Sequence, residues 1–156
     1  KGDVANAKRV AEEGARLYPE ADDLFKVLRV IKLKNREPVP VDESELIGMI
    51  REGKVNEALA RYEKDKKAFP HWRIFDENAM NDAGFFLLIE KKDVAAAIKV
   101  FELNAREFPK SPNTFDSLAE AQLIAGNRAE GIKNYQKAAA MGLENSKTML
   151  KELEGK

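Results

Sequence analysis

Residues 84–142 read GFFLLIEKKDVAAAIKVFELNAREFPKSPNTFDSLAEAQLIAGNRAEGIKNYQKAAAMG, and one phrase occurs twice in this stretch. A turn residue is followed five positions later by a small residue, and four positions after that by an aromatic one. The two copies are Lys92-Ala97-Phe101 and Gly126-Gly131-Tyr135. Because small and aromatic residues four apart lie on one face of a helix, the stretch predicts antiparallel helices joined by short turns.

The N-terminal half of the chain carries the same phrase, with either an aromatic residue or Ala at its third position and commonly a Pro eight residues further on. Its copies are Gly53-Ala58-Tyr62-Pro70 and Gly2-Ala7-Ala11-Pro19. The spacing inside each copy is constant while the distance between copies varies, which indicates one structural unit with insertions between its repeats. We therefore expect an all-α protein, in which antiparallel helix pairs form a right-handed superhelix that ends in a C-terminal capping helix.

Hydrophobic periodicity, capping residues and prolines predict the boundaries of the helices and of the repeats. The expected helices span 4–17, 21–34, 42–52, 55–69, 76–91, 94–108, 112–125, 128–141 and 144–153. A single domain over 1–156 would then comprise an incomplete N-terminal repeat plus a helix (1–36), a linker (37–41), three repeats (42–75, 76–111 and 112–143) and a capping helix (144–156).

The first segment lacks the first helix of a pair, because the chain opens at the turn that precedes a second helix. This pattern predicts that the chain is a piece of a longer protein. Pro38 and Pro40 cannot donate backbone hydrogen bonds, so they end the second helix and form a linker. We expect residues 1–36 to stack continuously on the rest, because two helices alone bury too little apolar surface to stand free.

The quoted stretch resembles tandem tetratricopeptide repeats (TPR) at Leu118-Ala119, Gly126-Asn127 and Tyr135, whereas residues 1–70 match only in their spacing. The strings FELNAREFPKSPNTFDSLAEA and GIKNYQKA further resemble the C-terminal repeat region of bacterial serine hydrolases, of the penicillin-recognising (beta-lactamase-like) type or the alpha/beta-hydrolase esterase type. This resemblance implies a TPR-like α-solenoid whose catalytic domain is absent from this chain.

The small and aromatic positions have a packing explanation. Two helices approach closely only where a side chain is nearly missing, so Ala58, Ala97 and Gly131 are expected between the helices of a pair. Tyr62, Phe101 and Tyr135 are expected to fill the core beside them.

In the TPR resemblance, the outward face of each first helix lines a concave groove. The groove candidates are Lys26, Val30, Asp82, Phe86, Ile89, Asn113, Asp116, Glu120 and Leu123. The acidic members would repel a peptide carboxylate. We expect the groove to bind a basic or amphipathic protein segment, with its charges at the rim and Phe86 and Ile89 beneath. The alternative is a solvated acidic face.

Trp72 lies in a long connection, where an aromatic residue either seals a helix end or anchors a partner, and we favour sealing. His71 has no second His or Cys with which to form a zinc site. Asp116 and Glu120 share a helical face, yet nothing in the sequence places either in the buried environment of a tuned acid. We predict no catalytic residues, no metal and no cofactor, so the chain is not expected to be an enzyme.

Composition excludes several classes of partner. The 27 basic and 27 acidic side chains cancel, so no net charge attracts nucleic acid. No apolar run approaches the roughly 20 residues of a membrane helix. The absence of cysteine suits the cytoplasm and the periplasm equally. We expect a protein-protein interaction scaffold, and the alternative is a structural or dimerisation appendage of a larger bacterial hydrolase, either packed on its own catalytic domain or forming a homodimer.

Overall fold

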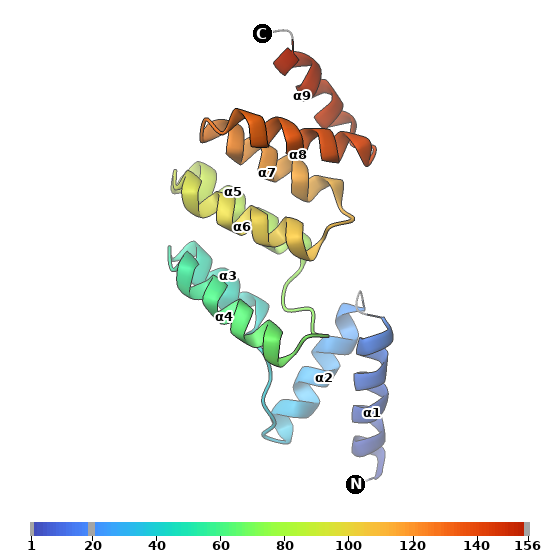
Figure 1. Ribbon diagram of the computed structural model, residues 1–156. Coiled ribbons are helices and arrows are strands. Elements are labelled where there is room, and N and C mark those ends of the chain that lie inside the picture. The colour runs from blue at the N-terminus through green and yellow to red at the C-terminus, as the bar shows by residue number, and fades with distance from the viewer. Residues whose placement is uncertain (1, 19–20, 155–156) are drawn as a thin grey trace. The chain divides into compact units, whose positions relative to one another are not determined.

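The computed structural model describes residues 2–18 and 21–154, and every regular element within them is helical (Figure 1). The elements are α1 (Gly2–Leu17), α2 (Asp22–Lys34), α3 (Glu43–Arg51), α4 (Val55–Ala68), α5 (Glu77–Phe85), the π-helix η1 (Phe86–Glu90), α6 (Val94–Glu107), α7 (Pro112–Ile124), α8 (Arg128–Ala140) and α9 (Glu144–Glu154). The all-α prediction is therefore confirmed, and the predicted helix boundaries are met within about two residues everywhere except at η1.

The chain divides into two compact units. Unit 1 consists of Lys1–Gly48 and Asn56–Asp76, and unit 2 consists of Met49–Val55 and Glu77–Lys156. The stacking of residues 1–36 on the rest stays a prediction.

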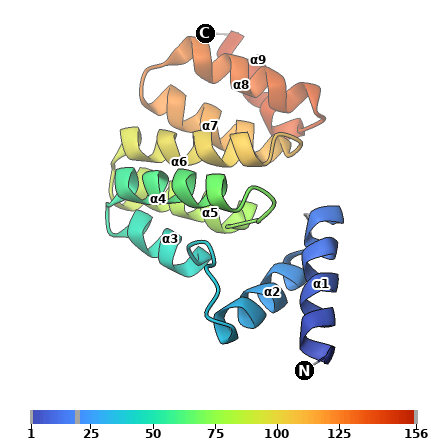
Figure 2. The same ribbon diagram turned by 60° about the horizontal axis from the view of Figure 1, so that its bottom comes forward.

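In unit 2, α5 packs on α6, α6 on α7, α7 on α8, and α8 on α9 (Figures 1 and 2). The small positions of the repeated phrase lie at these contacts. Ala97 and Gly131 are buried, and so are the aromatic residues Phe101 and Tyr135. A Cβ at Gly131 would lie 2.8 Å from Cδ2 of Leu123 and 3.1 Å from the carbonyl oxygen of Ala119. The packing explanation given for these positions is confirmed.

The segment Phe86–Glu90 corrects the prediction of one continuous α-helix ending near Lys91. The N–H of Lys91 donates to the carbonyl of Phe86, five residues back, at 3.1 Å. This turn holds one more residue than an α-turn, and both Leu87 and Leu88 within it are buried. The prediction assumed a 3.6-residue period throughout, so it did not include this turn.

The turns of the repeated phrase adopt a left-handed backbone. Gly53 has φ 83° and Gly126 has φ 81°, whereas Lys92 occupies the corresponding place in the third copy with φ 56°. After this turn, the carboxylate of Asp93 accepts a hydrogen bond from the N–H of Ala96 at 3.0 Å and caps α6. The same turn geometry is therefore reached without a glycine.

In unit 1, α1 and α2 form a helical hairpin. Lys8 pairs with Glu37 at 2.6 Å, and Lys32 pairs with Glu37 at 3.2 Å and with Glu12 at 3.1 Å. Phe25 and Leu28 are buried, whereas Leu33 on the same helix is exposed. The hairpin is therefore held by ion pairs as well as by apolar contact.

The buried carboxylate of Asp65 anchors the segment that follows this hairpin. It accepts hydrogen bonds from the backbone N–H of Val41 at 2.6 Å and from Nε of Arg61 at 2.8 Å. Tyr62, beside it on α4, is buried and packs on Phe75 with their ring centroids 5.3 Å apart. A buried charge is tolerated here because two donors satisfy it.

Candidate functional site

The predicted groove residues fall into two groups. Lys26 and Val30 lie on α2 in unit 1, where both are exposed. The members in unit 2 lie on α5, η1 and α7, and α5 and α7 are in contact. They are Asp82, Phe86, Ile89, Asn113, Asp116, Glu120 and Leu123.

Phe86 and Ile89 provide the apolar part of this face. Ile89 is 61 % exposed, and Phe86 is partly exposed. Two cations already lie over the Phe86 ring, since Cζ of Arg51 is 5.6 Å and Nζ of Lys91 is 5.5 Å from its centroid. Cations over an aromatic face are attracted by its negative electrostatic potential. The ring of Phe86 is thus an apolar surface that two cations of its own unit already flank, and the acidic charge of the face lies on α5 and α7 instead.

The side chain of Leu123 packs between two helices. Its side chain occupies the space that a Cβ at Gly131 would need. Leu123 therefore fills the contact between α7 and α8, and only part of its surface reaches solvent. Asn113 and Asp82 are exposed. The acidic residues of α7 make up the polar part of the face.

Asp116 joins α7 to the capping helix α9. Its carboxylate accepts a short hydrogen bond from Oγ of the fully buried Ser146, and a second from Nδ2 of Asn145 at 3.1 Å. Both donors are neutral. Among the residues that the structure describes, no basic side chain forms an ion pair with Asp82, Asp116 or Glu120. Within the described part of the chain, the acidic side chains of this face therefore form no ion pair with a basic side chain.

The pKa values of Glu120 and Tyr135 are both raised. Burial raises the pKa of the Glu120 carboxyl above its ordinary value, and the neighbouring charge of Asp116 adds to the effect. Burial, followed by the charges of Asp116 and Glu120, raises the pKa of Tyr135 to about 12. No residue pattern in the sequence indicated that the pKa of Glu120 would be raised.

The raised pKa of Glu120 predicts a pH-dependent loss of stability. The folded state keeps this proton to higher pH than the unfolded chain, whose carboxyl has the ordinary value of 4.5, so the stabilisation is complete below that pH and is lost as pH rises through the raised value. Above it, Glu120→Gln should be more stable than the wild type, and the two should converge in acid. Urea unfolding from pH 4 to 8 measures this, with Glu102→Gln on the exposed face of α6 as the control. A constant difference across this range would contradict it.

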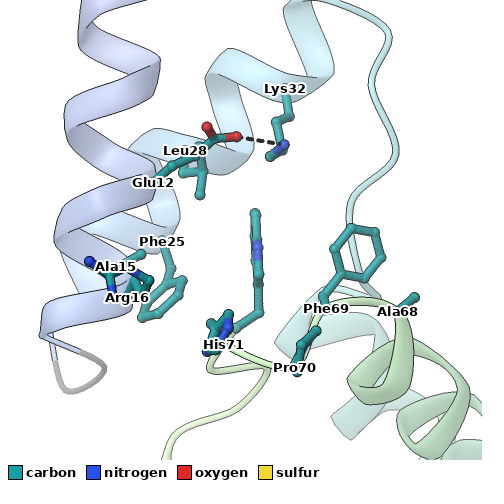
Figure 3. Close-up of a pocket in the computed structure, with 11 residues that line it drawn as sticks. Glu12, Ala15, Arg16, Phe25, Leu28, Lys32, Ala68, Phe69, Pro70 and His71 are labelled. Atoms are coloured by element: carbon teal, nitrogen blue, oxygen red, sulfur yellow. Dashed lines mark ion pairs between the residues drawn. The ribbon is translucent and has the colours of Figure 1, made fainter.

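Trp72 lies in unit 1 beside a hollow of about 240 Å³ (Figure 3). The side chain is only 8 % exposed, with its ring 5.8 Å from that of Phe25 and 5.9 Å from that of Phe69. Its carbonyl accepts a hydrogen bond from Nζ of Lys66 at 2.9 Å. Trp72 therefore packs α2 against the end of α4, which favours the sealing role over that of a partner anchor.

His71 lines the same hollow, where no described serine lies beside it. His71 is exposed, and the hollow is lined by apolar side chains, by Arg16 and by the ion pair of Glu12 and Lys32, without a serine. Ser146 contacts Asp116 in unit 2 instead of a histidine. Over residues 2–18 and 21–154, no group of three or more His, Cys, Asp or Glu side chains is placed to hold a metal ion.

In the part of the chain that the structure describes, no helix combines the length and the apolar character needed to cross a membrane. No protein-family model matches the sequence, and no curated protein matches it either.

Proposed function

We propose that this chain is a non-catalytic protein-interaction module of TPR-like helix pairs, which wind into a right-handed superhelix. Its ligand is a basic, amphipathic segment of a partner protein. The binding face consists of Asp82, Phe86, Ile89, Asn113 and Glu120. The observation that carries this proposal is the exposed carboxylate of Glu120 on α7, which lies near the charge of Asp116 and forms no ion pair with a basic side chain of residues 2–18 or 21–154.

A basic partner would supply the missing charge. An exposed carboxylate such as that of Glu120 attracts a nearby cation, although salt screens the attraction. Ile89 and Phe86 offer apolar area on the neighbouring segment η1. A helix or extended strand with Lys or Arg on one face and Leu on the other would meet both features. Complementary charge of this kind mainly determines specificity and the association rate.

A titration with two synthetic peptides tests the proposal. One peptide carries Lys on its polar face and Leu on its apolar face, and the other has Glu in place of every Lys. We expect only the basic peptide to bind, shifting the amide resonances of α5, η1 and α7 in a ¹H–¹⁵N spectrum. Glu120→Gln should weaken binding by about 2- to 5-fold, the effect of one exposed ion pair, and Glu102→Gln should leave it unchanged.

This experiment separates binding from folding. Glu120→Gln is expected to raise stability at neutral pH while it weakens peptide binding, a combination that loss of structure cannot produce. Equal binding of the acidic and basic peptides, or resonance shifts confined to unit 1, would contradict the proposed face.

The second candidate function is that of a structural or dimerisation appendage. A specific observation favours it, namely the row of exposed apolar side chains on α1.

A further inference from the structure

The hollow of about 240 Å³ in unit 1 is lined by residues of α1, α2 and the end of α4 (Figure 3). Its walls are mostly apolar, and three aromatic rings form part of them. The ring centroid of Trp72 lies 5.8 Å from that of Phe25 and 5.9 Å from that of Phe69. Ala15 and Leu28 add aliphatic surface. The hollow therefore offers an apolar space beside aromatic rings that are packed on one another.

The size of the hollow limits its occupant to about one ring on a short chain. An apolar cavity of about 150 Å³ holds a benzene molecule, and the hollow is larger than that, at about 240 Å³. An aromatic occupant is favoured over an aliphatic one of the same size, because offset or edge-to-face contacts between rings add stabilisation beyond the burial of their surface.

The charged residues of the hollow indicate the polar end of the occupant. Nζ of Lys32 pairs with Glu12 at 3.1 Å and with Glu37 at 3.2 Å, so the charge of Lys32 is already balanced. Arg16 lies one helical turn after Glu12, and Figure 3 shows it apart from the ion pair. Arg16 is exposed and forms no ion pair with a side chain of residues 2–18 or 21–154. The hollow therefore carries one cation that no described carboxylate balances.

We propose that the hollow binds a small aryl-alkyl carboxylic acid, with its ring beside Trp72 and Phe25 and its carboxylate at Arg16. A guanidinium and a carboxylate are both planar and form two parallel hydrogen bonds. The ring, the short chain and the single negative charge of such an acid each match one feature of the hollow. The site lies in unit 1, so it is independent of the peptide-binding face proposed in unit 2.

Tryptophan fluorescence tests this binding directly, because Trp72 lines the hollow and the chain contains no other tryptophan. Three compounds of similar shape are titrated, namely hydrocinnamate, its neutral amide and the cation phenylpropylamine. We expect hydrocinnamate to change the emission saturably with a millimolar dissociation constant. The amide should bind about 2- to 5-fold more weakly, and the amine more weakly still. No saturable change with hydrocinnamate, or equally tight binding of the amide, would overturn the proposal.

Two pairs of variants at exposed positions locate the ligand. Arg16→Gln should bind the acid no more tightly than the amide, whereas Arg9→Gln removes the same charge from α1 outside the hollow and should keep the difference. Ala68→Leu narrows the hollow and should weaken the binding of all three compounds, whereas Ala7→Leu should leave it unchanged. A preference for the acid that survives in Arg16→Gln, or unchanged binding to Ala68→Leu, would overturn the site.

A tripeptide that ends in phenylalanine with a free carboxylate distinguishes a free acid from the C-terminus of a protein. It presents the same ring and the same charge, but its chain continues beyond the volume of the hollow. We expect it to bind more weakly than hydrocinnamate. Tighter binding of the tripeptide would overturn the assignment to a small free acid.

Discussion

Replacing Phe101 by Ala is expected to lower the free energy of unfolding of unit 2 by about 3–5 kcal/mol. Phe101 is fully buried on α6, and its ring packs edge-on against Phe85 with the centroids 5.1 Å apart. The neighbouring helices are held by their own contacts and cannot close the space that the ring leaves. Urea unfolding followed by circular dichroism at one fixed protein concentration measures the change.

Phe86→Ala is the matched control for Phe101→Ala. The two residues are chemically identical, but Phe86 is partly exposed. Its truncation should therefore cost clearly less stability, while it should weaken binding of the basic peptide. An equal loss of stability for the two variants would contradict the assignment of Phe101 to the core and of Phe86 to the binding face.

The substitution Gly84→Ala is expected to lower the free energy of unfolding by about 1–3 kcal/mol, although alanine favours helices. A Cβ at position 84 would lie 2.4 Å from Cε1 and 2.7 Å from Cζ of Phe101. The buried ring must move against Phe85 to make room. The chain offers a control in Gly48, where an added Cβ meets nothing within 4 Å. Gly48→Ala should raise stability by about 0.5–1 kcal/mol through helix propensity alone.

A double-mutant cycle checks the cause of the Gly84 effect. In a Phe101→Leu background the ring is absent, so Gly84→Ala should cost less than it does in the wild type. Additive effects of the two substitutions would show that the penalty arises elsewhere than at this contact.

The repeated phrase was a sufficient guide to the helices because its information is local. Turn residues such as Gly126, and helix starts such as Pro112, act on their own backbone within a few residues. The phrase also predicted the burial of Ala97 and Tyr135, because a small residue and an aromatic residue four positions later pack at the contact between the two helices of a pair. These features were predicted correctly from the residues alone.

The candidate site was predicted less completely. The groove residues were assigned through the TPR resemblance, in which one α-helix would carry Asp82, Phe86 and Ile89, whereas the structure has a π-turn after Phe85. The resemblance did not indicate that Leu123 also packs against Gly131 or that Asp116 also binds α9. Helical spacing indicates the side on which a residue lies, and the helices that pack there decide whether solvent reaches it.

The sequence by itself determined the all-α class, the positions of the helices and the small residues at which they meet, because propensity, capping and periodicity depend on neighbours along the chain. The tertiary structure decided the π-turn at Phe86, the raised pKa of Glu120 and the packing of Trp72. Each of these depends on residues that are distant in sequence. The burial of a residue and the electrostatic potential at it depend on all of its neighbours in space, and only the folded chain brings these neighbours together.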